Sequence, residues 1–489
     1  MSKRMPGTVW AWGALGTAGS VLVALAGPRL ATRGAHGWWF EPRVSHGFAT
    51  ALLYAGLVVI CIAWLGLGSQ LHAANGVRLW LIGALWTAPV LLGPALFSRD
   101  VYSYLAQSEI LHLGLDPYRD APVVLAQHGQ AQLLAAVSPF WRHTTAPYGP
   151  LFVALVSPIA SLSRSNPIDA VLLVKLLDAA GLVLLAVFVP RLARSLGADP
   201  RRAAWLAVLS PLTMLELVAA GHNDALMAGL MAAGLALAIE DRPLAGVGLC
   251  AVAATIKLPA AAGIVFIVVA AARGADTRAG RARLVGAAAL LTTAVLALIS
   301  VATGVGAHWL STGVFSTPQK VRLAITPATG IGYTLASVLH HVGITANARS
   351  IESAFGDLAG VLVLVLAAML LWRVSKPTLV RDLGIVLVAA AVGGPAAWPW
   401  YLIWGLALLA ACPGPQRARP FPFALTVPVF LIKADGIALP PRPYSPLVVV
   451  LYSVLVVLAV IAWQTWRRNG GALPRLARRP APPRPGPST

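Results

Sequence analysis

The chain has very few charged side chains for its length. Charged residues make up 11% of its 489 residues and hydrophobic residues 58%, and the mean hydropathy is +0.76. A soluble protein of this size needs far more charge on its surface, since roughly a quarter of an average soluble chain is charged. The composition therefore excludes an ordinary soluble enzyme and indicates a membrane protein.

Cysteine is also scarce, and familiar motifs of soluble enzymes are missing. The three cysteines, Cys61, Cys250 and Cys412, lie in or beside apolar runs without the spacing of metal ligands. We therefore expect neither a disulfide framework nor a zinc site. There is no Walker-type loop, dinucleotide-binding glycine motif or Gly-x-Ser-x-Gly, so a soluble nucleotide donor has no support. We expect no cofactor and no bound metal, because the carboxylates outside the apolar runs are too scattered to surround an ion.

Long apolar runs are what the chain has in abundance. A helix of about 20 apolar residues crosses a hydrocarbon core of ~30 Å, and the runs are continuous rather than alternating, which favours helices over barrel strands. We predict an all-α polytopic membrane protein with about 13–14 transmembrane helices. The predicted spans are 9–28, 48–68, 79–97, 170–190, 203–219, 224–239, 244–256, 259–272, 284–302, 354–372, 383–397, 400–411, 421–432 and 446–466.

The basic residues set the predicted orientation. The apolar segment 150–162 is only thirteen residues long. Counting it as a crossing would place the arginine-rich segments 191–202 and 273–283 outside, against the positive-inside rule. We therefore predict that 150–162 re-enters the membrane without crossing it. Both termini and the majority of the 37 Lys and Arg then lie inside.

Residues 1–466 are predicted to form one membrane domain, and the basic tail 467–489 to be disordered, cytoplasmic and attracted to anionic headgroups. Basic residues that hold cytoplasmic loops in place explain the net charge of +20, so no nucleic-acid partner is expected. The long outer segments 29–47, 98–148 and 303–350 hold most polar and aromatic residues outside the spans. A transporter would concentrate polar groups at mid-bilayer. This distribution instead favours chemistry on a lipid-borne substrate at the outer interface.

Asp100 stands directly after an apolar run, next to Arg99. A carboxylate at the end of a membrane helix is unfavourable unless it is used or paired. Two interpretations follow. Asp100 and Arg99 form an ion pair that caps the helix, or Asp100 is a general base that faces an outer active site.

The segment 102–113 is predicted to be a short amphipathic helix on the membrane surface, with residues such as Leu105 and Ile110 facing lipid. Asp116 precedes Pro117, which is typical of an Asx turn that ends a helix. A direct catalytic role for Asp116 is the less favoured alternative.

Two further outer stretches contain polar and aromatic side chains. Trp141 and Tyr148 are either interfacial anchors or the walls of a sugar pocket. His222, Asn223 and Asp224 follow one another at the start of an apolar run. A helix cap with a helix-dipole partner explains Asn223 or Asp224, but not all three residues together. His222 and Asn223 are candidates to bind sugar hydroxyls or a phosphate.

Lys257 lies deep, at the tip of a hairpin between apolar runs. It either snorkels to the interface or contacts an anion, and a cation there would stabilise the charge on a leaving phosphate. Trp398, Trp400 and Tyr401 are an aromatic wall for a prenyl chain or sugar, or part of the interfacial belt. One carboxylate, one deep cation and these groups on one membrane face suit glycosyl transfer from a lipid phosphate.

Five motifs occur in order within about residues 75–410: SRDVYSY at 98–104, GLDPY at 114–118, WRH at 141–143, PYGPL at 147–151 and GHNDALM at 221–227. In this order they resemble the GT-C superfamily of polytopic glycosyltransferases. The closer resemblance is to the actinobacterial MptA/MptB-type α-(1→6)-mannosyltransferases, which use polyprenyl-phosphate mannose. No departure from the family pattern occurs at the motif residues.

The resemblance implies a GT-C fold and an inverting single displacement on the extracytoplasmic face of the cell membrane, with Asp100 as catalytic base and Lys257 at the donor phosphate. The implied acceptor is of phosphatidylinositol-mannoside or lipomannan type, and initiation and elongation of the mannan remain alternatives. We assign the other candidate residues to the donor (His222, Asn223, Asp224, Arg99) and to the acceptor (Tyr102, Tyr104, Tyr148, Trp141, Trp400).

Other functions remain as alternatives. A GT-C transferase for another polyprenyl-phosphate sugar, such as arabinose, is the nearest. A lipid flippase or transporter is favoured only by Lys175 and Asp178, nearly one turn apart in a span, and a local ion pair explains them as well. A purely structural subunit would leave the placement of Asp100 and Lys257 unexplained.

Overall fold

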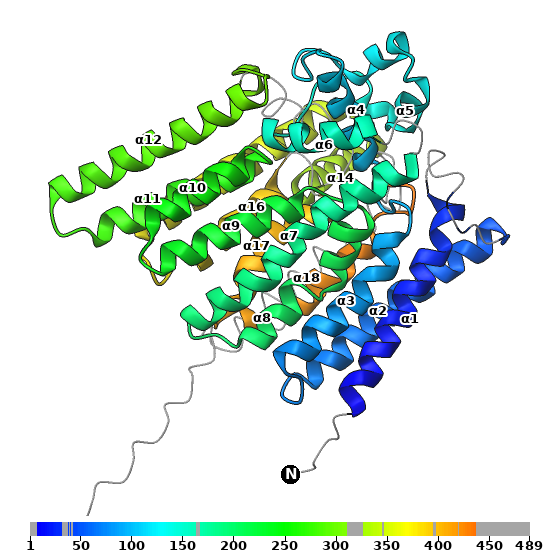
Figure 1. Ribbon diagram of the computed structural model, residues 1–489, viewed down its shortest axis with the longest axis horizontal. Coiled ribbons are helices and arrows are strands. Elements are labelled where there is room, and N and C mark those ends of the chain that lie inside the picture. Colours follow the sequence, from blue (N-terminus) through cyan, green and yellow to red (C-terminus); the bar gives the residue numbers. More distant parts are fainter. Residues whose placement is uncertain are drawn as a thin grey trace, which may run out of the picture.

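A computed structural model shows a bundle of helices with a cap of short elements at one end (Figure 1). It describes residues 7–31, 38, 40, 43–162, 167–310, 326–344, 347–394, 398–418 and 420–436. The regular elements of these ranges are helices without strands, which confirms the all-α class. The α-helices and one π-helix, η4, are α1 (Gly7–Leu30), α2 (His46–Ser69), α3 (Gly76–Leu92), α4 (Asp100–His112), α5 (Ala131–Ala136), α6 (Pro150–Leu162), α7 (Pro167–Ser195), α8 (Pro200–Ala207), η4 (Thr213–Ala219), α9 (Asp224–Ile239), α10 (Pro243–Ala254), α11 (Ala261–Gly274), α12 (Arg278–Ala302), α14 (Pro327–His341), α15 (Ala348–Arg373), α16 (Leu379–Gly393), α17 (Leu402–Ala410) and α18 (Phe421–Thr426).

Five helices in the described ranges are long and apolar enough to cross a membrane, namely α1, α2, α7, α12 and α15. They coincide with five of the predicted spans: 9–28, 48–68, 170–190, 284–302 and 354–372. The shorter apolar helices have 10–17 residues, too few for length alone to show a crossing, so the total number of crossings stays a prediction. The predicted span 446–466 and the tail 467–489 lie outside the described residues.

The predicted span 203–219 is wrong as a continuous helix, because the chain forms α8, a break and then η4. Pro211 lacks the N–H that a continuing helix needs, and the Thr213 hydroxyl instead donates to Ala207 O at 2.7 Å. η4 then meets α9 at a bend of 117°. Residues 221–223 therefore form the corner between two helices.

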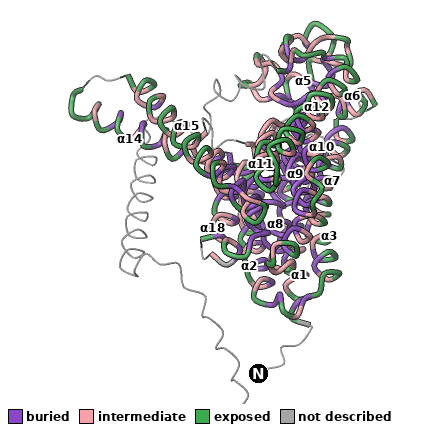
Figure 2. Tube along the Cα trace, turned by 90° about the vertical axis from the view of Figure 1, so that its left-hand side faces the viewer, coloured by how far each residue is buried: buried purple, intermediate pink, exposed green. Residues whose placement is uncertain are grey.

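α7 and α9 approach each other closely because glycines face the contact. A Cβ on Gly181 would lie 2.2 Å from the carbonyl carbon of Ala225, and one on Gly229 would lie 2.6 Å from Gly181 O. Small residues allow membrane helices to pack at such short range. α9 is consequently buried along nearly its whole length. Figure 2 shows the buried residues gathered around it, while α14 and α15 reach away from the main body.

The prediction that 102–113 lies on the membrane surface is wrong. The corresponding helix, α4, is buried along most of its length, and Leu105 and Ile110, which were expected to face lipid, are 3% and 0% exposed. α6 packs along α4, and the Ser108 hydroxyl donates to Val153 O at 2.9 Å. α4 thus lies inside the protein, at the capped end of the bundle (Figure 1).

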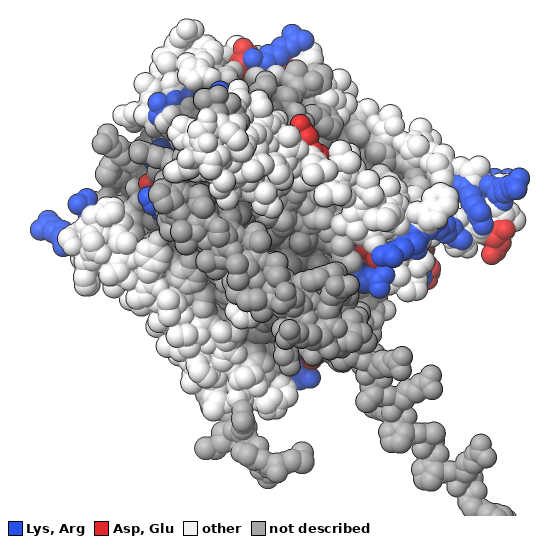
Figure 3. Space-filling model, turned by 180° about the vertical axis from the view of Figure 1, so that it is seen from behind, with Lys and Arg blue, Asp and Glu red and all other residues white. Residues whose placement is uncertain are grey.

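Charged side chains stand at the ends of the helices rather than along their flanks. Figure 3 shows Lys and Arg mostly toward the extremities of the described part, with few charged atoms on the white surface of this face. Large apolar side chains are exposed on such flanks, for example Leu290 and Leu298 on α12 at 73% and 69%. This pattern is expected of a protein that crosses a membrane.

Candidate active site

Asp100 is the first residue of α4, and two contacts hold the turn before it. The Phe97 N–H donates to Ala434 O at 3.0 Å, and the Ser98 hydroxyl accepts the N–H of Asp100 at 3.0 Å. Phe97 has a φ of 65°, an uncommon conformation for a bulky residue that persists only when its surroundings hold it. A distant C-terminal segment therefore helps to position the start of α4.

The carboxylate of Asp100 faces His222 and makes no ion pair with Arg99 in the described structure. Its Oδ2 lies 3.6 Å from His222 Nδ1, and the side chain is 15% exposed. Burial raises the pKa of Asp100 to about 6, although the positive charge of Lys257 opposes the shift. The interpretation as a capping pair is therefore wrong. Asp100 is a partly accessible carboxylate with unusual basicity.

His222 is fully buried at the corner between η4 and α9, and its ring stacks on Trp400 with centroids 3.9 Å apart. The Tyr104 hydroxyl lies 3.4 Å from both His222 Nδ1 and Asn223 Oδ1. His222 Nε2, Asn223 Nδ2 and Trp400 Nε1 are buried and have no hydrogen-bond partner in the described part of the chain. Buried polar atoms without partners are rare, so these three nitrogens are candidates to bind a polar ligand.

Lys257 belongs to the same cluster, and its ammonium group forms an ion pair with a carboxylate. Its Nζ lies 2.7 Å from Asp224 Oδ2; the lysine is 11% exposed and Asp224 is fully buried. Trp404 Nε1 donates to the other oxygen of Asp224, and the Tyr401 ring centroid lies 4.9 Å from the ammonium. The lysine therefore does not snorkel. Asp224 and the aromatic rings hold its charge inside the protein.

The backbone of Gly149 packs closely against the turn that follows α10. Its N–H donates to Ile256 O at 2.9 Å, and a Cβ at this position would lie 2.1 Å from Thr255 O. Only glycine fits there without a backbone shift. The contact places the Tyr148 ring edge-on to Tyr104, with centroids 4.7 Å apart.

Gly149→Ala is accordingly expected to destabilise the protein by about 1–3 kcal/mol, the usual cost of overpacking, because a backbone carbonyl cannot rotate away. The measurement is the Tm of the detergent-solubilised protein. Gly286→Ala is the control, since no heavy atom lies within 4 Å of a Cβ there and alanine favours a helix. Equal Tm values for both variants would contradict this close fit.

Two predicted acceptor residues, Tyr102 and Trp141, form no hydrogen bond or ring contact with the cluster in the described structure. Tyr102 is 2% exposed, and Trp141 is partly buried at the end of the short 3₁₀-helix η3 (Pro139–Trp141). The described structure gives neither residue a hydrogen bond or ring contact with His222, Asp224 or Lys257. Their role in acceptor binding stays a prediction.

Trp404 and Asp178 were not among the residues predicted for the site. Trp404 follows Trp400 by four residues, and helical spacing was a signal that they share a face. Asp178 on α7 is fully buried, and neither oxygen has a hydrogen-bond partner in the described ranges. It lies near enough to Asp224 and Lys257 for their charges to act on it.

Lys175 and Asp178 do not form the local ion pair that was one explanation for their spacing. Lys175 Nζ instead donates to Val90 O and Gly93 O, both at 2.7 Å. These carbonyls at the end of α3 have no partner within the helix, and the lysine satisfies them. Lys175 is thereby explained as a helix cap, whereas Asp178 has no hydrogen-bond partner in the described ranges.

Asp116 lies beyond the opposite end of α4 and belongs to a turn. Its Oδ1 accepts the Tyr118 N–H at 2.9 Å, which confirms the predicted Asx turn, and its Oδ2 lies 2.6 Å from His308 Nδ1. Among the described residues, no group of three or more His, Cys, Asp or Glu side chains is arranged to hold a metal ion.

The fold and this cluster define a polytopic, all-α membrane protein with a buried polar site at the corner between η4 and α9. Comparison with known protein families shows which family of membrane proteins this chain belongs to. Residues 11–273 match the family described as "Alpha-(1->6)-mannopyranosyltransferase, N-terminal domain", and residues 326–462 match the "MptB C-terminal domain". The chain belongs to this α-(1→6)-mannopyranosyltransferase family.

Curated relatives are similar over most of their length. The chain is 34% identical to alpha-(1->6)-mannopyranosyltransferase A of Mycobacterium tuberculosis, over 86% of this chain and 84% of that protein. It is 33% identical to a probable alpha-(1->6)-mannopyranosyltransferase of Mycolicibacterium smegmatis, over 87% and 80%. It is 27% identical to alpha-(1->6)-mannopyranosyltransferase B of Corynebacterium glutamicum, over 78% and 67%. No solved structure matches the chain.

Proposed function

We propose that this protein is a membrane mannosyltransferase that moves mannose from polyprenyl-phosphate mannose to a lipid-linked mannan of phosphatidylinositol-mannoside or lipomannan type. It forms α-(1→6) linkages on the extracytoplasmic face of the cell membrane. The names of the relatives support mannosyl transfer. The observation that carries the proposal is the partly accessible carboxylate of Asp100, with a pKa of about 6, beside a buried cluster that contains a lysine.

In the proposed reaction, the acceptor hydroxyl oxygen forms a bond to the anomeric carbon of mannose as the bond from that carbon to the phosphate oxygen breaks. Asp100 takes the hydroxyl proton, and polyprenyl phosphate leaves with the electron pair. A carboxylate with a pKa near 6 is mostly ionised at neutral pH yet more basic than an ordinary aspartate, as a general base requires. Lys257 stabilises the charge on the departing phosphate.

The remaining groups of the cluster suit recognition of the sugars, His222 and Asn223 on the donor and Trp400 on the acceptor. His222 Nε2, Asn223 Nδ2 and Trp400 Nε1 are buried polar atoms without partners among the described residues, and sugar hydroxyls would satisfy them. The role of Asp224 is indirect. It is fully buried and holds Lys257 in place, so it orients the cation instead of touching the phosphate.

The test of this function is transfer of radiolabelled mannose from polyprenyl-phosphate mannose to mannosylated lipid. Membranes that contain the protein are compared with matched membranes that lack it, and a decaprenyl-phosphate arabinose donor is assayed in parallel. We expect transfer from the mannose donor alone, into α-(1→6)-linked product. Transfer from the arabinose donor alone would replace the proposed sugar, and transfer from neither donor would overturn the proposed donors.

The rate of transfer should also depend on pH in a defined direction. Asp100 must be ionised to accept a proton, so activity is lost as the pH falls through the pKa of about 6, and kcat/KM falls roughly tenfold per pH unit below it. The control is Asp276→Asn, which removes an exposed carboxylate in the loop between α11 and α12 and should leave the profile unchanged. A profile that stays flat down to about pH 5 contradicts the assignment of the base.

A further inference from the structure

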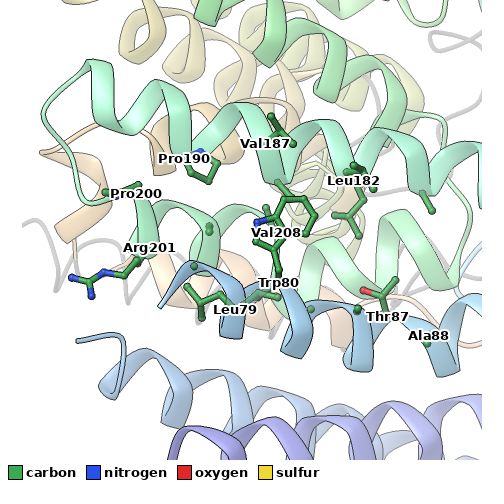
Figure 4. A pocket seen from close by; sticks show the side chains of 18 of the residues that line it. Leu79, Trp80, Thr87, Ala88, Leu182, Val187, Pro190, Pro200, Arg201 and Val208 are labelled. Atoms are coloured by element: carbon green, nitrogen blue, oxygen red, sulfur yellow. The ribbon is translucent and has the colours of Figure 1, made fainter. Parts of the chain in front are cut away.

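An apolar groove runs between α3, α7 and α8, away from the polar cluster. It has a volume of about 720 Å³, and its walls include Leu79, Leu182 and Val208 (Figure 4). Along α3 it extends from Gly76 to Leu91, which is roughly 22 Å at the rise of an α-helix. That length is about the depth of one membrane leaflet with its headgroup region.

The groove exists because the facing helices carry small side chains. Gly83, Ala84 and Ala88 line it on α3, and Ala186 and Ala204 line it on α7 and α8. Exposed apolar residues of α3 and α7, such as Trp80 at 47% and Val183 at 52%, flank these positions. Such a furrow leaves apolar surface that the described side chains do not cover.

Charge is confined to one end of the groove. Arg194 and Arg201 are the charged residues of its lining, and both stand where α7 ends and α8 begins; Figure 4 labels Arg201. Arg194 has no ion-pair partner among the described residues, whereas Arg201 lies 3.7 Å from Asp199 and remains 44% exposed. The end of the groove therefore keeps a net positive charge.

The opposite end of the groove is separated from the candidate active site. Lys175 spans from α7 to the last carbonyls of α3, Val90 O and Gly93 O. Its Cγ also packs against the backbone of Gly221, where a Cβ would lie 3.0 Å away. This layer stands between the groove and the corner that carries His222. The groove is therefore a site distinct from the polar cluster.

We propose that this groove binds one anionic phospholipid, with an acyl chain along α3 and α7 and its phosphate at Arg194 and Arg201. Apolar walls of one leaflet's depth match the chain, and the basic end matches an acidic headgroup. Basic pockets between transmembrane helices on the cytoplasmic side bind such headgroups, and this end carries the arginines that the positive-inside rule places there. The bound lipid fills the furrow between α3, α7 and α8.

The experiment is native mass spectrometry of the full-length purified protein in micelles that contain equal amounts of phosphatidylglycerol and phosphatidylcholine. We expect one phosphatidylglycerol to be retained in preference to phosphatidylcholine. The Arg194→Gln/Arg201→Gln variant should bind it roughly tenfold or more weakly, since each basic residue near an anionic headgroup contributes several-fold. Ala186→Trp should fill the groove and lower retention of both lipids.

The matched control is Arg278→Gln/Arg283→Gln, which removes two exposed charges from α12, outside the groove lining, and should leave retention unchanged. Both arginine variants are checked by Tm, and their altered side chains are at the surface, so they test the proposal even if Ala186→Trp does not fold. Equal retention of the two lipids, or equal loss in the two arginine variants, would show nonspecific lipid only and overturn the proposal.

Discussion

Asp100→Asn is expected to lower the rate of mannosyl transfer by at least about 10²-fold, the usual contribution of a general base. The substitution keeps the size of the side chain and its place in the first turn of α4 but removes the ability to take a proton. The rate is measured with radiolabelled polyprenyl-phosphate mannose in membranes at matched expression.

The geometry explains why no neighbouring carboxylate should replace Asp100. Asp224 is fully buried and paired with Lys257, and Asp178 is fully buried on α7. Asp100 keeps 15% of its side chain exposed, so an acceptor hydroxyl can reach it. Asp276→Asn, which removes an exposed carboxylate elsewhere, should keep wild-type activity. Full activity of Asp100→Asn would mean that the base is another group and that Asp100 serves only the start of the helix.

Lys257→Met should have two separable effects. It removes the cation proposed to stabilise the leaving phosphate, which should lower transfer by roughly 10²–10³-fold, as loss of one electrostatic contact does in other active sites. It also leaves Asp224 buried without its partner, which should cost about 3–5 kcal/mol of stability. The measurements are the transfer assay and the Tm of the purified variant.

The double variant Asp224→Asn/Lys257→Met separates these two effects. Asn keeps an oxygen that can accept the hydrogen bond from Trp404 and leaves no unpaired charge, so the Tm should return close to that of wild type. Activity should stay low, because the cation is still missing. Recovery of activity together with stability would show that Lys257 serves the fold rather than the donor phosphate.

Part of the candidate site could be predicted from the sequence because an isolated charge in apolar surroundings is unfavourable unless it is paired or has a function. Asp100 and Lys257 stand at the ends of apolar runs, and His222 stands at a junction between two runs. The structure brings all three to one cluster. Trp141 and Tyr102 were predicted to bind the acceptor, and the described structure gives neither a hydrogen bond or ring contact with that cluster. Residue type marks a candidate for sugar binding, whereas burial and distance decide its neighbours.

The sequence by itself determined the class and the longest helices, because about twenty continuous apolar residues have one stable form in a bilayer, a helix that satisfies its own backbone. Only the tertiary structure decided what depends on neighbours distant in the chain. The packing of α6 against α4 buries α4. Asp224 forms an ion pair with Lys257, and Lys175 donates hydrogen bonds to the last carbonyls of α3. The order of apolar residues along the sequence indicates which faces of a helix are apolar. The partner of a buried charge, in contrast, is set by packing between helices that lie far apart in the sequence.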